Sequence, residues 1–433
     1  MKDLVNRLDD LSRRDFARYL AKSFLGVGFG IPAFQSLAKA SDQRALLNAS
    51  SGSAKRVIYL YMSGGMSHLD TLDPKTDETV RGPVSSIATN ADGIHLSEHM
   101  ARLGKQMDKV SLIRSLSSNQ GAHERGRYFM RTGYTQRGTI RHPSTGAWTM
   151  RLAGKLNRTL PGYVTVGGDS RHPGAGFMEA KYAPLPIGDP EAGLQNSRLP
   201  RGTSMARMQR RLGIANRIDA VFKARYDQRS VRAYSDAYRD AINLMSSQDL
   251  HAFDISREAE ATRTGYGDNA FGQGCLLARR LVEKDVRFVE VSSGGWDTHQ
   301  NNFDRVRDKA RELDQALGML LEDLDRRGLL NETLVVLATE FGRTPKINQN
   351  TGRDHYPKAF SCLLAGGGVK GGYVHGATNE QGTEVVKNSV SIPDFNATIA
   401  QAIGLPQEEV IMSESGRPFT VAHKGKAISE VFA

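Results

Sequence analysis

Two kinds of hydrophobic pattern alternate along the second half of the chain. Continuous apolar runs of strand length occupy residues 286–292, 333–338 and 360–365. Between the first two runs, apolar residues recur at spacings of three and four from Phe303 to Leu324, which predicts a long amphipathic helix. Strands that are apolar on both faces and separated by helices predict an α/β fold, namely a doubly wound, mainly parallel sheet with helices on both faces.

The first half of the chain adds further strands and one region of different character. The apolar runs at residues 57–62 and 163–166 stop at glycine turns, and residues 110–113 form a third candidate strand. Residues from about 170 to 265 are instead polar, rich in arginine and mostly helical in propensity. We interpret them as a helical insertion within a single domain of residues 55–433, and not as a second independent domain.

An arginine pair near the start of the chain belongs to a pattern that is typical of a targeting signal. Arg13 and Arg14 are followed by an apolar, glycine-bearing stretch at residues 19–37 and then by small residues up to Ala40. This order predicts a twin-arginine signal peptide over residues 1–40, cleaved after Ala40. An uncleaved anchor and an amphipathic helix with two solvated arginines are the alternatives.

The signal predicts the route and destination of the protein. We expect the twin-arginine translocase to export the chain to the periplasm or out of the cell. A polar linker at residues 41–54 follows the signal. No later apolar run is long enough to cross a membrane, so no stable span is expected after cleavage.

Charge and cysteine content narrow the range of partners. The formal net charge is +11, which favours anionic partners such as phosphate or sulfate esters, acidic polysaccharide or an anionic membrane surface. The basic residues are dispersed and no nucleic-acid-binding motif is present, so nucleic acid is not an expected partner. Cys275 and Cys362 stand in apolar surroundings, where buried free cysteines are the commoner state, although an oxidising compartment would permit a disulfide.

Metal-binding residue types follow the predicted strands. They are His68 and Asp70 after the first strand, Asp297 and His299 after residues 286–292, Glu340 after residues 333–338, and Asp354 and His355 in a later loop. Each one alone is more typical of a helix cap or a turn. Ligands bind beyond the carboxyl ends of parallel strands, and carboxylates that converge there need a cation or protons between them. The mixture suits zinc or manganese, and a subset made of carboxylates alone would suit magnesium or calcium.

The segment after residues 110–113 offers candidates for catalysis and substrate binding. Ser117 and Ser118 are possible nucleophiles, and the exposed amides of a helix start there would favour an anion. A serine N-cap is the more ordinary explanation of both serines. His123 is a candidate catalytic group, and Arg114 and Arg125 are candidates for holding a phosphate or sulfate, or are simply solvated.

Four longer motifs carry a family resemblance. They are Gly64-Gly65-Met66-Ser67-His68-Leu69-Asp70-Thr71-Leu72-Asp73-Pro74-Lys75, Gly295-Trp296-Asp297-Thr298-His299, Thr339-Glu340-Phe341-Gly342-Arg343-Thr344-Pro345 and Gly352-Arg353-Asp354-His355-Tyr356-Pro357. Together they resemble the signatures of the exported "domain of unknown function 1501" proteins, a distant branch of the alkaline phosphatase and sulfatase superfamily. The resemblance implies a doubly wound sheet, metal ions at its carboxyl edge, and chemistry on phosphoryl or sulfuryl esters.

The resemblance also implies roles for individual residues. The metal ligands would be His68, Asp70, Asp297, His299, Glu340 and His355. Beyond the resemblance, we expect Asp73, Asp354 and His123 to orient those ligands, and Arg343 and Arg125 to face an anionic substrate. The chain departs from the superfamily in the short Asp297-Thr298-His299 spacing, in Glu340-Phe341 where an Asp-His pair is usual, and in the absence of the sulfatase Cys-x-Pro-Ser-Arg motif.

Two functions of different class remain open from the sequence. The first is an exported metal-dependent hydrolase of phosphate or sulfate esters, which the Asp, Glu and His set favours. The second is a non-catalytic periplasmic binding or assembly protein that keeps a metal or anion site, for an acidic glycan for example, which the missing nucleophile favours. Fold alone does not decide between them.

Overall fold

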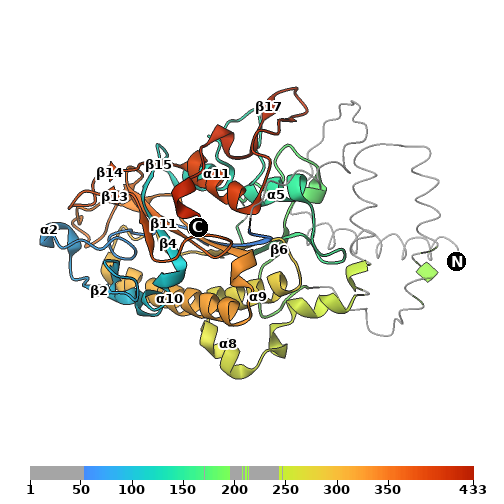
Figure 1. Ribbon diagram of the computed structural model, residues 1–433, viewed down its shortest axis with the longest axis horizontal. Coiled ribbons are helices and arrows are strands. Elements are labelled where there is room, and N and C mark those ends of the chain that lie inside the picture. Colours follow the sequence, from blue (N-terminus) through green and yellow to red (C-terminus); the bar gives the residue numbers. More distant parts are fainter. Residues whose placement is uncertain are drawn as a thin grey trace, which may run out of the picture.

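A computed structural model of the chain describes residues 53–169, 171–195, 207, 210–211, 213, 243–245 and 247–433. The predicted signal peptide, nearly all of the linker and nearly half of the predicted insertion lie outside these residues. The described part is built on one nine-stranded sheet (Figure 1). Its strands are β1 (Arg56–Met62), β4 (Val110–Ser117), β5 (Tyr163–Val166), β6 (Leu185–Ile187), β7 (Phe288–Ser293), β8 (Thr333–Ala338), β11 (Phe360–Ala365), β12 (Tyr373–His375) and β15 (Val390–Ser391).

The strand order confirms the predicted sheet and corrects one direction. The order is β12-β4-β11-β8-β1-β7-β5-β6, with β15 paired to β4. The neighbours β11, β8, β1 and β7 are the four strands that the apolar runs predict most clearly. All pairings are parallel except those of β11, which runs antiparallel to both β4 and β8. The amino end of β11 therefore lies at the edge of the sheet where the parallel strands have their carboxyl ends.

Two layers of helices cover the sheet (Figure 1). On one face, α3 (Ala101–Gly104), α9 (Ala270–Glu283) and α10 (Asn302–Arg326) pack against the sheet, with α8 (Glu260–Tyr266) outside them. On the other face lie α4 (His123–Thr132), α5 (Thr145–Ala153) and α11 (Ile392–Ile403). The long amphipathic helix predicted from Phe303 to Leu324 is α10, which buries its apolar stripe from Val306 to Leu324.

The two cores also separate the two cysteines. Cys275 is fully buried in the core under α9, and Cys362 is fully buried in the core on the opposite face of the sheet. Burial raises the pKa of both thiols, because a thiolate would be poorly solvated there. Both are free cysteines.

Short ribbons and one short helix surround the sheet. They are α2 (Glu78–Arg81) and the antiparallel pairs β2 (Ser86–Ala88) with β3 (His95–Ser97), β9 (Gly342–Arg343) with β10 (His355–Tyr356), β13 (Ala377–Thr378) with β14 (Val385–Lys387), and β16 (Ile411–Met412) with β17 (Pro418–Phe419). The β9–β10 ribbon matters most for the site, because its register places His355 opposite Arg343.

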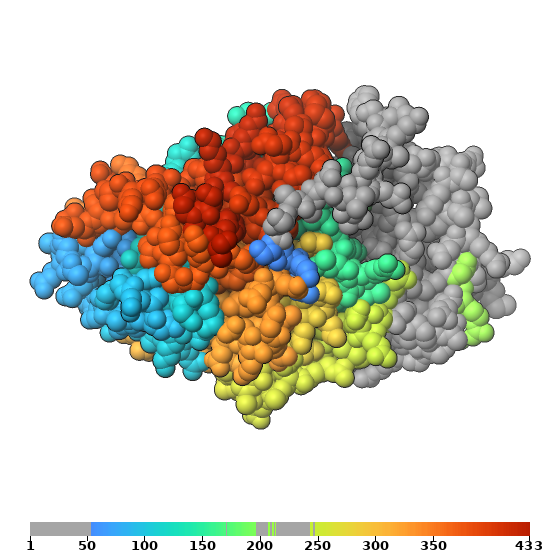
Figure 2. Space-filling view, in the orientation of Figure 1, coloured from blue at the N-terminus to red at the C-terminus, as the bar shows by residue number. Residues whose placement is uncertain are grey.

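The predicted insertion contributes to the sheet at one point. Residues 185–187 form β6, which extends the sheet beyond β5 as a parallel edge strand. In the space-filling view the C-terminal segments cover the upper part of the described surface, and the segments around α8 to α10 cover the lower part (Figure 2). Among the described helices, none combines the length and the apolar content needed to cross a membrane.

Candidate metal centre

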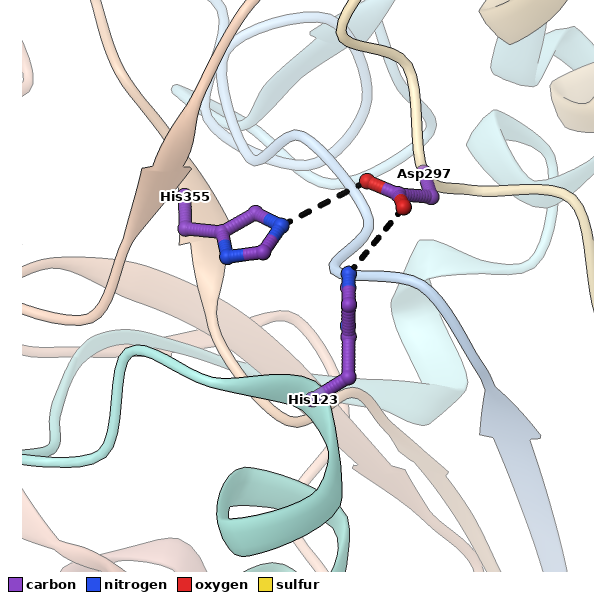
Figure 3. Close-up of side chains that lie close together, drawn as sticks. All are labelled: His123, Asp297 and His355. Atoms are coloured by element: carbon purple, nitrogen blue, oxygen red, sulfur yellow. Dashed lines mark ion pairs between the residues drawn. The ribbon is translucent and has the colours of Figure 1, made fainter.

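Three side chains from distant parts of the chain point toward one another beyond the sheet (Figure 3). His123 Nε2 lies 3.3 Å from Asp297 Oδ2, and His355 Nε2 lies 3.5 Å from Asp297 Oδ1. The potential ligand atoms of these three residues all lie within 4.8 Å of one another. His299 joins them, with Nε2 at 3.2 Å from Asp297 Oδ1 and 3.0 Å from His355 Nε2. We call His123, Asp297, His299 and His355 the four-residue cluster.

The fold brings the members of the four-residue cluster from three directions. Asp297 and His299 lie in the loop that follows β7, where Gly295 takes a φ of 95° that other residues rarely adopt. His123 is the first residue of α4, shortly after β4 ends. His355 lies on β10, just before the antiparallel strand β11. The carboxyl ends of the parallel strands and the amino end of β11 thus meet at one edge.

Each histidine of the cluster is held through its Nδ1 atom. Nδ1 of His355 lies 2.8 Å from the carbonyl oxygen of Gly121, and Nδ1 of His299 lies 2.7 Å from Asp354 Oδ1. Because both partners are acceptors, each Nδ1 carries the hydrogen and donates it. The lone pairs of the two Nε2 atoms then face each other across 3.0 Å, which is an unfavourable contact unless a cation lies between them.

His123 is held in the same way by a buried carboxylate. Its Nδ1 lies 2.8 Å from Glu340 Oε1. Glu340 follows β8 directly, is 1% exposed, and also accepts hydrogen bonds from the Gly64 amide and the Tyr61 hydroxyl. Nε2 of His123 is buried and has no hydrogen-bond partner among the residues that the structure describes, so its lone pair is directed at the cluster. A histidine that donates Nδ1–H to a carboxylate and leaves Nε2 free is the usual arrangement of a metal ligand.

The carboxylate at the centre is kept ionised by an arginine. Burial would raise the pKa of Asp297, but the hydrogen bond and charge of Arg343, with His123 and His299, lower it to about 2. Arg343 Nη2 lies 2.6 Å from Asp297 Oδ1. Burial and the positive charges nearby lower the pKa of His355, which favours the neutral imidazole that binds metal.

The donor set fits a transition metal. Three imidazole nitrogens and one carboxylate are ligands that zinc accepts in tetrahedral sites, and manganese also accepts mixtures of nitrogen and oxygen. The orphaned Nε2 of His123 and the facing Nε2 atoms of His299 and His355 would all be satisfied by one ion. Magnesium and calcium prefer oxygen ligands and fit this set less well.

The structure brings several of the residues singled out in the sequence together at this place. They are Asp297, His299 and His355 within the four-residue cluster, and Glu340 and Asp354 behind its histidines. Two positions differ from the sequence-based roles. His123 presents a free nitrogen to the cluster, while Glu340 lies behind His123 and is fully engaged by hydrogen-bond donors.

His68 and Asp70 have other partners. Asp70 is fully buried and forms a bidentate ion pair with Arg353. His68 is also fully buried and lies 3.2 Å from the Gly382 carbonyl oxygen through Nε2, and burial lowers its pKa to about 4. Neither residue belongs to the group of potential metal ligands found in the described part of the chain. Asp73 is likewise engaged, by Lys75 and Arg114.

The predicted substrate-binding arginines are placed differently from one another. Arg343 is fully buried and donates to the carbonyl oxygens of Gly64, Gly65 and Arg353 as well as to Asp297, so it orients the cluster and does not face solvent. Arg114 donates to the Leu72 and His95 carbonyl oxygens. Arg125 is exposed on α4.

The two candidate nucleophiles make local contacts. Ser118 Oγ accepts a hydrogen bond from the Gln120 amide at 3.1 Å, which is a serine turn. Ser117 Oγ lies 3.4 Å from Ser389 Oγ, at the pairing of β4 with β15. These contacts agree with the ordinary structural explanation of both serines.

One residue near the cluster escaped the sequence analysis. Arg353 precedes Asp354 and is fully buried, yet its role depends on Asp70, which lies 283 positions earlier in the chain. The available signal was the glycine before it in Gly352-Arg353-Asp354-His355, since Gly352 packs directly against the backbone of His299. A motif in which glycine and arginine precede two candidate ligands suggests a tightly packed turn, but it does not identify the partner of the arginine.

Comparisons with known proteins agree with the motifs. A sequence profile of the family described as "Protein of unknown function (DUF1501)" matches residues 54–432. None of the curated proteins searched matches the chain.

Several solved structures are similar to this chain at low sequence identity. A PsFucS1 sulfatase from Pseudoalteromonas sp. is 13% identical, with a TM-score of 0.38 and coverage of 88% of this chain and 72% of the other. A protein in the alkaline phosphatase superfamily from Vibrio parahaemolyticus is 9% identical, with a TM-score of 0.38 and coverage of 96% and 78%. Alkaline phosphatase from the Antarctic bacterium TAB5 is 13% identical, with a TM-score of 0.34 and coverage of 76% and 96%.

Proposed function

The chain belongs to the DUF1501 family, and we propose that it is an exported, metal-dependent hydrolase of phosphate or sulfate esters. The observation that carries this proposal is the four-residue cluster. Its three histidines are fixed through Nδ1 and direct Nε2 at one ionised carboxylate. A site built in this way is prepared to bind a cation.

The charges at the site favour one divalent ion. The side chains in mutual contact include three carboxylates, from Asp297, Asp354 and Glu340, and one guanidinium, from Arg343. With neutral imidazoles their sum is −2, which a single divalent cation balances. We propose zinc or manganese as that ion, because nitrogen ligands predominate.

The substrate class rests on the family resemblance and on charge. The motifs resemble those of the DUF1501 proteins, a distant branch of the alkaline phosphatase and sulfatase superfamily, and the net charge of +11 for the full sequence favours an anionic substrate. A divalent ion at the cluster would supply Lewis-acid stabilisation for the negative charge that develops during ester hydrolysis. The residues of the chain would hold the ion, and Arg343 would keep Asp297 in position to do so.

A second candidate function has an observation in its favour. The hydroxyls of Ser117 and Ser118 are engaged with Ser389 and the Gln120 amide, and so do not act as obvious nucleophiles at the cluster. A protein that binds metal without hydrolysing esters would need no nucleophile. The two functions differ in turnover and not in metal content.

The test is metal analysis combined with ester assays on the exported protein. We expect about one zinc or manganese ion per chain, and turnover of an aryl phosphate or aryl sulfate ester that chelation abolishes and added metal restores. His355→Ala should weaken metal binding at least about 100-fold, because the loss of an outer-shell partner alone costs 10–100-fold. His251→Ala, at an exposed histidine, serves as the matched control.

The outcomes separate the two functions. Bound metal without turnover of any phosphate or sulfate ester would favour the binding protein. An absence of bound zinc and manganese, with His355→Ala indistinguishable from His251→Ala, would contradict both functions.

Export is a separate part of the proposal, and it is tested at the signal. Replacing Arg13 and Arg14 together by lysine should leave full-length precursor in the cytoplasm, because the translocase reads the arginine pair. Fractionation followed by immunoblotting measures the distribution. Normal export of the double variant would exclude the twin-arginine route.

A further inference from the structure

A buried ion pair lies beside the four-residue cluster. Arg353 Nε lies 2.9 Å from Asp70 Oδ2, and Arg353 Nη2 lies 3.0 Å from Asp70 Oδ1. Both side chains are completely buried. The carboxylate accepts two further hydrogen bonds, from the Ser67 hydroxyl at 2.6 Å and from the Asn302 side-chain amide at 2.9 Å. The pair is therefore rigid, since a bidentate contact fixes orientation as well as distance.

The same arginine fastens three more carbonyl groups. It donates to the oxygens of Thr344, Pro345 and Val80, at 3.1, 2.5 and 2.7 Å. With the two bonds to Asp70, all five N–H groups of the guanidinium are used. One side chain thus joins the loop after β1, the end of α2 and the loop after β9.

The backbone of Arg353 lies between the segments that carry the cluster. Its amide donates to the Thr298 carbonyl oxygen at 3.0 Å, between Asp297 and His299. Its carbonyl oxygen accepts a hydrogen bond from Arg343 Nη1 at 3.1 Å, and Arg343 holds Asp297. The cluster member His355 follows Arg353 by two positions.

Asn302 makes a second link to the same place. Its side-chain NH2 group donates to Asp70, and its side-chain oxygen Oδ1 accepts a hydrogen bond from the Thr298 hydroxyl at 2.7 Å. Asp70 is thus connected to Thr298, the neighbour of Asp297, by two independent routes, which run through Arg353 and through Asn302. Movement of the Asp70 loop would move both segments of the cluster.

We propose that Asp70 and Arg353 are positioning residues that set the spacing of Asp297 and His299 relative to His355, and so set the affinity of the centre for metal. This inference rests on the metal centre proposed above. Neither residue touches the ion. They act through the turn at Gly352 and Arg353, which packs against the backbone of His299.

The competing explanation is a pair that only stabilises the core. Buried ion pairs are poor stabilisers, because replacement by apolar residues of similar size is often neutral. A purely stabilising pair would change the unfolding midpoint of the protein and leave the metal affinity of the folded protein unchanged. A positioning pair changes the affinity as well.

The experiment compares two buried aspartates, using zinc as the probe. Asp323 is also completely buried and is paired with the buried Arg279, but it lies 21 residues beyond Asn302 on α10, about 30 Å along the helix. We measure zinc affinity by calorimetry on metal-free, folded Asp70→Asn and Asp323→Asn, with thermal unfolding of each. Both should unfold at lower temperature, and only Asp70→Asn should bind zinc about tenfold more weakly.

Two further variants keep the test decisive if Asp70→Asn does not fold. Arg353→Lys keeps the positive charge opposite Asp70 but loses the bidentate contact of the guanidinium, and it should also weaken zinc binding. The double variant Asp70→Leu/Arg353→Met removes both charges and should also bind zinc more weakly than the wild type.

Equal zinc affinity, within about twofold, in the wild type and in every folded variant of Asp70 or Arg353 would overturn the positioning role. Failure of the wild type itself to bind zinc or manganese would instead overturn the metal centre.

Discussion

Two groups of charged residues lie near the carboxyl edge of the sheet, and they are completed in different ways. In the first, the buried Arg131 contacts Glu290 at 2.7 Å and Asp169 at 2.6 Å. His172 Nε2 lies 3.1 Å from the other oxygen of Glu290, and its Nδ1 accepts the Gly174 amide at 3.0 Å. Every charged group in this network has a partner within the protein.

The four-residue cluster differs because the hydrogen bonds that hold its histidines are made at Nδ1, on the side away from Asp297. Each histidine is satisfied at Nδ1, and each Nε2 faces Asp297. The comparison suggests that a closed network maintains the fold, while an open one is prepared for a ligand. It also predicts that mutations in the two groups have opposite consequences.

The largest expected effect is the loss of metal from Asp297→Ala. Removing the only carboxylate of the cluster should lower zinc affinity at least about 100-fold. The unfolding temperature should fall less than in a variant of Arg131, because the Asp297 side chain is 46% exposed and Arg343 keeps its hydrogen bonds to the carbonyl oxygens of Gly65 and Arg353. Calorimetry and thermal unfolding measure the two quantities. A large loss of stability with unchanged zinc binding would reverse the comparison.

Arg131→Met should have the opposite result. It leaves the buried Glu290 and the partly buried Asp169 without their shared arginine, which should destabilise the protein by about 3–5 kcal/mol. Zinc affinity of the folded variant should stay within about threefold of the wild type. Arg125→Met, at an exposed position on the same helix, is the control and should change stability by less than about 0.5 kcal/mol. Urea unfolding checks both values.

Acid should weaken the closed network in a defined range of pH. Burial would raise the pKa of Glu290, but Arg131 and His172 lower it from 4.5 to about 2. A depressed pKa in the folded state contributes stability above the unfolded value, and this stability is lost as the pH falls from about 4.5 toward 2. The slope of unfolding free energy against pH should therefore be smaller in Glu290→Gln. Equal slopes would show that Glu290 is not responsible.

The smallest expected effects concern the two serines. Ser117→Ala and Ser118→Ala remove local hydrogen bonds at the end of β4, each contributing about 1 kcal/mol or less. Zinc affinity and any ester turnover should stay within about twofold of the wild type. A hundredfold loss of turnover in either variant would identify that serine as the nucleophile and would contradict the structural explanation.

The continuous apolar runs alone were enough to predict most of the strands of the sheet. The runs at residues 57–62, 333–338 and 360–365 are apolar on both faces because their strands lie inside the sheet with helices on either side. The direction of β11 could not be predicted, because an apolar strand has the same composition in either orientation. Its reversal explains why His355 reaches the site from before a strand and not from after one.

The position of the cluster at the carboxyl edge of the sheet could be predicted, but the roles of its individual residues could not. Asp297 and Glu340 each follow a parallel strand, so the sequence places them at one edge. Whether Glu340 binds an ion or supports His123 depends on how deeply its side chain is buried. Glu340 follows a central strand, and its carboxylate accepts hydrogen bonds from the Gly64 amide and the Tyr61 hydroxyl. The burial of this side chain results from packing between distant segments of the chain, and a single sequence does not show which segments pack together.

The reversal of β11 also has a consequence for the order of assembly during synthesis. β11 fills the position between β4 and β8, whose sequences are more than 200 residues apart. Until the ribosome has released residues 360–365, β4 has no partner on that side, and the β9–β10 ribbon that carries His355 has no β11 beside it. The four-residue cluster is therefore among the last parts to form, and contacts of such long range form slowly. Pulse proteolysis of chains truncated before Phe360 would detect this dependence as a loss of protection of β4.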